Sequence, residues 1–126
     1  LLQQSDFIVV AVDLNHDSQA LIGEAQFDLM QKHAVFINIA RGSVVDENAL
    51  IDALQQNKIF AAGLDVYAKE PLQSSALFDL ANVVTAPHIG SATAETRKKM
   101  VDLAYQNLID ALEDRTPRYL VNPKFE

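Results

Sequence analysis

Short apolar runs alternate along the chain with segments of helical periodicity, and this alternation restricts the fold more than any other feature. The runs lie at residues 7–12, 34–39, 60–66 and 83–86. Apolar runs of about four to eight residues are typical of parallel strands that are buried on both faces of a sheet. Helical segments between such runs supply the crossovers that join parallel strands. The sequence therefore predicts an α/β fold built on a parallel sheet.

Three segments between and after the runs carry helix signals. They lie at residues 24–30, 46–56 and 93–112. In each segment, apolar side chains recur at intervals of three or four residues, which places them on one face of a helix. Asp46 stands where an N-cap is expected, and the Thr116–Pro117 pair follows the last segment as a stop signal.

Composition and charge narrow the class of protein. The chain has 126 residues, about the length of one domain, and 49% of them are hydrophobic, so a sizeable core is possible. The formal net charge of −7 argues against sequence-independent binding to nucleic acid, which needs clustered lysine and arginine. No stretch approaches the roughly 20 consecutive apolar residues of a membrane span. We expect a cytoplasmic protein with no nucleic-acid partner, no membrane partner and no metal.

The beginning of the chain indicates a segment of a longer protein. The chain starts at Leu1, and its first six residues resemble the end of a helix or loop that leads into a buried strand. No positively charged and then apolar leader opens it. We therefore expect further sequence before residue 1.

Ionisable side chains follow three of the apolar runs, at Arg41, Glu70 and His88. Open α/β sheets bind ligands outside the carboxyl ends of their strands, so these side chains can converge on one ligand in a shared cleft. A guanidinium can hold a carboxylate through two parallel hydrogen bonds, and an imidazole can move a proton near neutral pH. A carboxylate beside the imidazole favours its charged form. The set indicates a site for an anionic substrate.

Each of these residues also has an ordinary structural explanation. Arg41 could pair with Asp46 or Glu47 on the surface, as most exposed charges serve solvation. His88 and Glu70 could be structural residues of their loops. Position alone does not separate these explanations from a catalytic role.

Two further residues accompany the set. Asp65 ends an apolar run, where a carboxylate needs partners, and it could cap a neighbouring backbone or accept a hydrogen bond from a ligand amide. Pro87 fixes the approach of the backbone to His88, and Gly90 permits a positive φ or close contact with a ligand. Asp65 and Gly90 are therefore the two further candidates for the same site.

Several strings of the sequence resemble the D-isomer-specific 2-hydroxyacid dehydrogenases, in matching order and spacing over nearly the whole chain. They are residues 38–47 (NIARGSVVDE), 63–67 (GLDVY), 70–71 (EP) and 87–93 (PHIGSAT). Within that family, the strings most similar to glyoxylate/hydroxypyruvate reductases, including the 2-ketogluconate reductase type, are residues 61–66 (AAGLDV), 90–97 (GSATAETR) and 121–123 (VNP).

The resemblance implies an enzyme that transfers hydride from NADH or NADPH to a small 2-keto acid, such as glyoxylate, hydroxypyruvate or 2-ketogluconate, giving the D-2-hydroxy acid. Arg41 would bind the substrate carboxylate and help to polarise the ketone. His88 would donate a proton to the carbonyl oxygen, and Glu70 would hold His88 protonated. The residues that the resemblance places at the NAD or NADP cofactor are Val12, Ile39, Ala40, Arg41, Asp65, His88 and Gly90.

Two features of the chain depart from the family pattern. Asp13 stands where the family commonly has proline, in the loop that would lie beside the adenosine half of the cofactor. No G-x-G-x-x-G string follows any apolar run, so the pyrophosphate-binding turn is missing. The expected fold is therefore the C-terminal half of a doubly wound, Rossmann-type NAD-binding domain over residues 1–114, with a tail at 115–126 that returns to a missing substrate domain.

The resemblance also implies a homodimer for the full-length enzyme. The isolated chain is expected to be inactive, and the half-domain is expected to expose one sheet edge and one apolar face. A second hypothesis is a non-enzymatic, NAD-dependent binding module. The family's C-terminal-binding-protein corepressors keep the arginine, glutamate and histidine but act mainly through partner recognition, and fold alone does not settle function.

Overall fold

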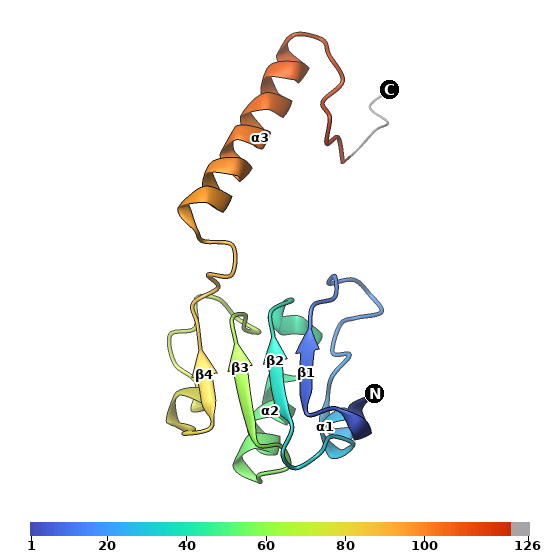
Figure 1. The fold of residues 1–126 in the computed structure, drawn as a ribbon, viewed down its shortest axis with the longest axis vertical. Coiled ribbons are helices and arrows are strands. Elements are labelled where there is room, and N and C mark those ends of the chain that lie inside the picture. The colour runs from blue at the N-terminus through green and yellow to red at the C-terminus, as the bar shows by residue number, and fades with distance from the viewer. Residues whose placement is uncertain (122–126) are drawn as a thin grey trace. The chain divides into compact units, whose positions relative to one another are not determined.

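The computed structural model describes residues 1–121 and divides the chain into two compact units, Leu1–Ile89 and the residues from Gly90 onward. The first unit contains the β-sheet and the second contains the longest helix (Figure 1). The end of the predicted tail, at residues 122–126, lies outside the described residues, and so does most of the VNP string.

Four parallel strands form one sheet in the order β1-β2-β3-β4 within the described residues (Figure 1). Their bounds are β1 Phe7–Val10, β2 Val35–Asn38, β3 Ala61–Leu64 and β4 Val83–Thr85. The predicted parallel sheet is confirmed, with residue pairs such as Phe36 and Ala62 in register between neighbouring strands. Each strand is shorter than its apolar run, because the terminal residues of the run already belong to the connecting loops.

Helices α1 and α2 connect the first three strands, as the periodicity predicts. The helix bounds are α1 Glu24–Asp28, α2 Glu47–Gln55 and α3 Ala94–Leu112. Helix α1 ends two residues before its predicted end, because the N–H groups of Leu29 and Met30 bond to carbonyls three residues back and tighten the turn. Helix α2 starts as predicted, since the Asp46 carboxylate accepts hydrogen bonds from the N–H groups of Asn48 and Ala49.

Short 3-10 helices lie before β1 and in two of the connecting segments. They are η1 Leu2–Gln4, η2 Gly42–Val44 and η3 Ala76–Asp79. Leu77 of η3 is buried and anchors the irregular stretch after Pro71. The next residue, Phe78, is 53% exposed and lies on the wall of a surface depression.

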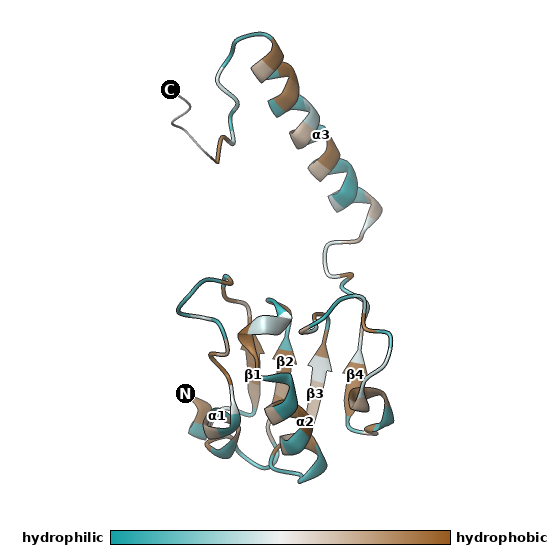
Figure 2. Cartoon of the chain, turned by 180° about the vertical axis from the view of Figure 1, so that it is seen from behind, coloured by the Kyte–Doolittle hydropathy of each residue, from teal (hydrophilic) through white to brown (hydrophobic). Residues whose placement is uncertain are grey.

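Helices α1 and α2 cover one face of the sheet (Figures 1 and 2). The core of the first unit lies between these helices and that face. Phe27 of α1 meets Phe36 of β2 edge to face, with ring centroids 5.2 Å apart. On the other face, Phe7 and Val84 are 68% and 74% exposed. Within the first unit by itself the strands are therefore buried on one face only, although such runs are typical of strands buried on both. The predicted exposed apolar face is present in this unit.

Helix α3 belongs to the second unit and carries the predicted apolar stripe (Figure 2). Its first turn is capped by Thr93, whose hydroxyl accepts a hydrogen bond from the N–H of Thr96. None of its residues is buried within this unit. No helix of residues 1–121 is long and apolar enough to cross a membrane.

Candidate functional site

The predicted site residues follow the carboxyl ends of the strands. Arg41 lies three residues after β2, Asp65 directly follows β3, and His88 lies three residues after β4. Glu70 belongs to the loop that begins at the end of β3. Because the strands are parallel, their carboxyl ends meet at one edge of the sheet, where the first unit presents these loops (Figure 1).

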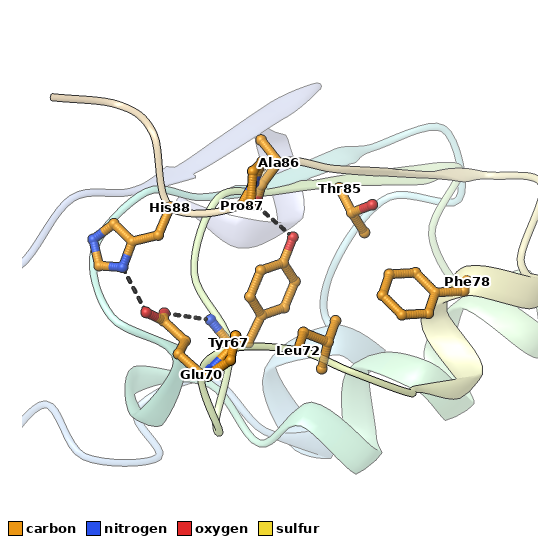
Figure 3. A pocket seen from close by; sticks show the side chains of 9 residues that line it. Tyr67, Glu70, Leu72, Phe78, Thr85, Ala86, Pro87 and His88 are labelled. Atoms are coloured by element: carbon orange, nitrogen blue, oxygen red, sulfur yellow. Dashed lines mark hydrogen bonds and ion pairs between the residues drawn. The ribbon is translucent and has the colours of Figure 1, made fainter. Parts of the chain in front are cut away.

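Glu70 and His88 form a direct pair at this edge (Figure 3). Nδ1 of His88 lies 2.6 Å from Oε2 of Glu70, and Oε1 of Glu70 accepts a hydrogen bond from the N–H of Tyr67 at 3.1 Å. The hydrogen bond with His88 lowers the pKa of Glu70, with smaller effects from the Tyr67 N–H and the charge of Arg41. An ionised carboxylate only accepts, so Nδ1 of His88 carries the shared hydrogen. The two side chains lie within hydrogen-bonding distance, as the sequence predicts.

The backbone of His88 has a left-handed conformation, with a φ of 54°. The sequence allowed a positive φ or close contact with a ligand at Gly90, but no glycine within residues 1–121 has a positive φ. The sharp turn comes earlier, directly after Pro87, and directs the imidazole toward Glu70 (Figure 3). Non-glycine residues are uncommon in this region of φ and ψ, and histidine is among the enriched types. Such a conformation persists where surrounding contacts fix it, as they do here.

Asp65 supplies one of these contacts. Its Oδ1 accepts a hydrogen bond from the N–H of Ile89 at 2.8 Å, so it fixes the backbone directly after His88. Of the two roles that the sequence allowed for Asp65, capping a neighbouring backbone is therefore observed. Binding of a ligand amide stays a prediction.

Arg41 does not form the surface ion pairs that its neighbours in sequence suggest. Asp46 caps helix α2, and Oε2 of Glu47 accepts from the N–H of Ala68 at 3.0 Å. Among residues 1–121, no salt bridge joins Arg41 to either carboxylate. The guanidinium is exposed and donates to the carbonyl of Ala40 at 2.6 Å. Its charge is therefore available to an anion at the edge of the sheet.

Two depressions lie at this edge, and they divide the predicted residues. The first has a volume of about 470 Å³ and includes Glu70 and His88 with Tyr67 (Figure 3). The second has a volume of about 670 Å³ and is lined by residues 11–15 and 39–41. It therefore contains the predicted cofactor residues Val12, Ile39, Ala40 and Arg41. Arg41 lines the second depression and Glu70 and His88 line the first, but the charge of Arg41 contributes to the lowered pKa of Glu70. One cleft shared by Arg41, Glu70 and His88 stays a prediction.

The loop that carries Asp13 is fixed by its own side chains. Oδ1 of Asn15 accepts from the N–H groups of Asp17 and Ser18, as expected for a turn. The hydroxyl of Ser18 donates to the carbonyl of Asp13 at 2.5 Å. This network holds one wall of the second depression.

Sequence reasoning did not single out Tyr67 or Gly42. The hydroxyl of Tyr67 lies 2.7 Å from the carbonyl oxygen of Ala86 and 3.1 Å from that of Leu64. A Cβ on Gly42 would overlap with the carbonyl group of Tyr67 and the backbone nitrogen of Ala68. A tyrosine directly after a predicted strand, and a glycine directly after a charged residue, were the available signals.

The parallel sheet, its covering helices and the polar residues at the carboxyl ends of its strands define a Rossmann-like α/β domain. Comparison with known families gives the specific assignment. Residues 1–90 match the NAD-binding domain of the D-isomer-specific 2-hydroxyacid dehydrogenases. The chain belongs to this family.

Individual relatives agree with the assignment. Glyoxylate/hydroxypyruvate reductase B of Salmonella newport is 52% identical over 125 residues, which are 98% of this chain and 39% of that protein. An NAD-complexed D-isomer-specific 2-hydroxyacid dehydrogenase from Lactobacillus delbrueckii superposes with a TM-score of 0.86 at 31% identity, covering 95% of this chain and 41% of the other.

An NADPH-dependent glyoxylate/hydroxypyruvate reductase from Sinorhizobium meliloti, solved with NADP and malonate, superposes with a TM-score of 0.85 at 32% identity. The match covers 95% of this chain and 41% of that protein. The chain therefore spans about two fifths of the length of these relatives.

Proposed function

We propose that the chain is part of an enzyme that reduces a small 2-keto acid to the D-2-hydroxy acid with NADH or NADPH. Glyoxylate, hydroxypyruvate and 2-ketogluconate are the candidate substrates. The observation that carries the proposal is the 2.6 Å pair of Glu70 and His88 at the carboxyl edge of the sheet, in a chain of this family. In the same proposal, residues 1–114 are the C-terminal part of the cofactor-binding domain, and the full-length enzyme is a cytoplasmic homodimer.

His88 is the proposed proton donor. Its Nδ1 is engaged with Glu70, so Nε2 is the atom that delivers the proton to the carbonyl oxygen of the substrate. Glu70 stays ionised, because the hydrogen bond with His88 lowers its pKa, and its carboxylate holds the ring through Nδ1. Oxidation of the hydroxy acid uses the same two residues in reverse, with His88 accepting the proton.

Arg41 is the proposed substrate anchor. Its exposed guanidinium can grip the carboxylate of a 2-keto acid with two parallel hydrogen bonds, which also fixes the direction of the adjacent ketone. The carboxylates nearest in sequence are engaged elsewhere and do not compete for it.

Residues 12–14 would lie beside the adenosine half of the proposed cofactor, and residues 39–41 would face its nicotinamide end. The depression formed by residues 11–15 and 39–41 offers backbone groups and apolar side chains at the carboxyl ends of β1 and β2, and Asp65 and Gly90 complete the predicted set. When bound, NADH or NADPH supplies the hydride that is added to the carbonyl carbon. None of the four glycines of the chain forms a pyrophosphate-binding turn, so the residues here do not fit the diphosphate.

The proposal is tested with an enzyme of family length, by which we mean a protein as long as the relatives above that contains this chain. The experiment is an assay of its activity. We expect glyoxylate, hydroxypyruvate or 2-ketogluconate to cause oxidation of NADH or NADPH, which is measured as a loss of absorbance of the reduced nucleotide. The matched control is the same enzyme with Arg41→Ala. A folded wild-type enzyme that binds the nucleotide but oxidises it with none of the three acids contradicts the proposal and favours a non-enzymatic binding module.

A further inference from the structure

Tyr67 belongs to the loop that carries Glu70, and its side chain reaches the segment that carries His88. It lies just after β3 and is only 7% exposed. Its hydroxyl is 2.7 Å from the carbonyl oxygen of Ala86 and 3.1 Å from that of Leu64. A phenol has one hydrogen to donate, and the shorter distance identifies Ala86 as the main acceptor. The side chain thus connects the end of β3 to the end of β4.

The backbone of Tyr67 is engaged with the same site. Its N–H donates to Oε1 of Glu70 at 3.1 Å, while Oε2 of that carboxylate meets His88 at 2.6 Å (Figure 3). Ala86, which accepts from the phenol, is two residues before His88. One residue therefore orients the carboxylate through its N–H and restrains the histidine segment through its side chain.

A third contact fixes Tyr67 itself. Gly42 packs so closely against the carbonyl group of Tyr67 that a Cβ at this position would overlap with it. The next residue, Ala68, donates its N–H to Glu47 of helix α2 at 3.0 Å. The segment directly after Arg41 thus supports the backbone of Tyr67 from the side of β2.

We propose that Tyr67 is a positioning residue, which sets the distance and angle between Glu70 and His88 through its hydrogen bonds to Glu70 and Ala86. The inference rests on the proposed function, since it concerns the same proton-transfer pair. Burial raises the pKa of the Tyr67 phenol, so the hydroxyl keeps its proton and donates at neutral pH. Tyr67 does not need to contact the substrate for this role.

Titration of the Glu70 carboxyl tests the proposal in the 126-residue chain without any need for activity. The carboxyl carbons of the glutamates are followed by NMR, and the signal that disappears in Glu70→Gln identifies residue 70. In Tyr67→Phe the hydrogen bond to Ala86 is lost, the histidine segment loosens, and the pKa of Glu70 should move up toward its ordinary value of 4.5. Tyr105→Phe, which changes an exposed tyrosine of α3, is the matched control and should leave that titration unchanged.

A second measurement uses an active enzyme of family length. We expect Tyr67→Phe to lower kcat by roughly three- to tenfold, the loss typical of one hydrogen bond, while the Kd for the nucleotide stays unchanged. Gly42→Ala should act in the same direction, because it displaces the Tyr67 carbonyl.

The two measurements separate the two proposals. An unchanged Glu70 titration in a folded Tyr67→Phe chain overturns the positioning role, and so does a variant whose thermal stability falls while kcat is preserved. A wild-type enzyme without reductase activity contradicts the proposed function, and the titration still decides whether Tyr67 positions the pair.

Discussion

On the covered face of the sheet, side chains are held by apolar packing, whereas at the carboxyl-terminal edge they are held by directed hydrogen bonds. Phe36 and Leu54 are 0% and 2% exposed in the core. The side chains of Glu70 and His88 are 35% and 43% exposed at the edge. Packing energy grows with buried area, and hydrogen bonds contribute less energy but fix geometry. Substitutions in the two regions should therefore affect different quantities, namely stability in the first and activity in the second.

The largest effect on stability is expected from Phe36→Ala in the covered face. The substitution removes a fully buried ring and its edge-to-face contact with Phe27, and such a change costs about 3–5 kcal/mol of unfolding free energy. Chemical denaturation of the chain measures it. Phe7→Ala, on the exposed face of the neighbouring strand, is the matched control and should cost less than about 1 kcal/mol. Equal losses in the two variants would mean that the uncovered face is packed in solution.

Arg41→Lys tests the role of the carboxyl-terminal edge in substrate binding and changes no residue of the core. A lysine keeps the charge but cannot form the two parallel hydrogen bonds of a guanidinium, so KM for the keto acid should rise about tenfold or more. Steady-state kinetics of the enzyme of family length gives this value, and the melting temperature should stay within error of the wild type. A lower melting temperature with an unchanged KM would assign Arg41 to the fold instead.

Asp46 lies between the two regions, because it caps the start of helix α2 directly after the segment that follows Arg41. The substitution Asp46→Ala tests this cap. Loss of the hydrogen bonds from Asn48 and Ala49 should cost about 1 kcal/mol of unfolding free energy. Asp17→Ala removes an exposed carboxylate that caps no helix and serves as the control. Thermal denaturation should show a clear fall in melting temperature for Asp46→Ala and none for Asp17→Ala.

The smallest expected effect is the dependence of stability on pH that comes from Glu70. Folding lowers the pKa of this carboxyl, mainly through the hydrogen bond from His88. Its contribution is therefore fully present above the ordinary pKa of 4.5 and is lost as the pH falls through the lower folded value. Glu70→Gln should flatten this part of the pH profile of unfolding free energy. An unchanged profile would show that the Glu70–His88 pair does not persist in solution.

Local patterns in the sequence were sufficient to predict the parallel strands and the helix cap at Asp46, because each of these features depends on residues that are close in the chain. The proximity of Glu70 and His88 also followed from strand ends that share one edge. The contact of Tyr67 with Ala86 could not be predicted in this way, because it is a tertiary hydrogen bond between residues 19 positions apart in the sequence. The left-handed backbone of His88 was missed for a related reason, since glycine is the usual residue with positive φ.

The uncovered face of the sheet illustrates a second limit of the sequence. Continuous apolar runs predict strands that are buried on both faces, so Phe7 and Phe36 could not be told apart by residue type. The exposure of Phe7 depends on which elements cover the sheet, and α1 and α2 cover only one side of it. The roles of Arg41, Glu70 and His88 in catalysis likewise stay predictions.

Turnover of His88→Gln in the enzyme of family length tests the central claim most directly. Glutamine has a similar size and can still form a hydrogen bond with Glu70, but it cannot donate a proton in the transition state. We expect kcat to fall by about 10²–10⁴-fold, while the Kd for the nucleotide and the melting temperature change little. A His88→Gln enzyme with wild-type turnover of its keto acid would contradict the assignment of proton transfer to His88.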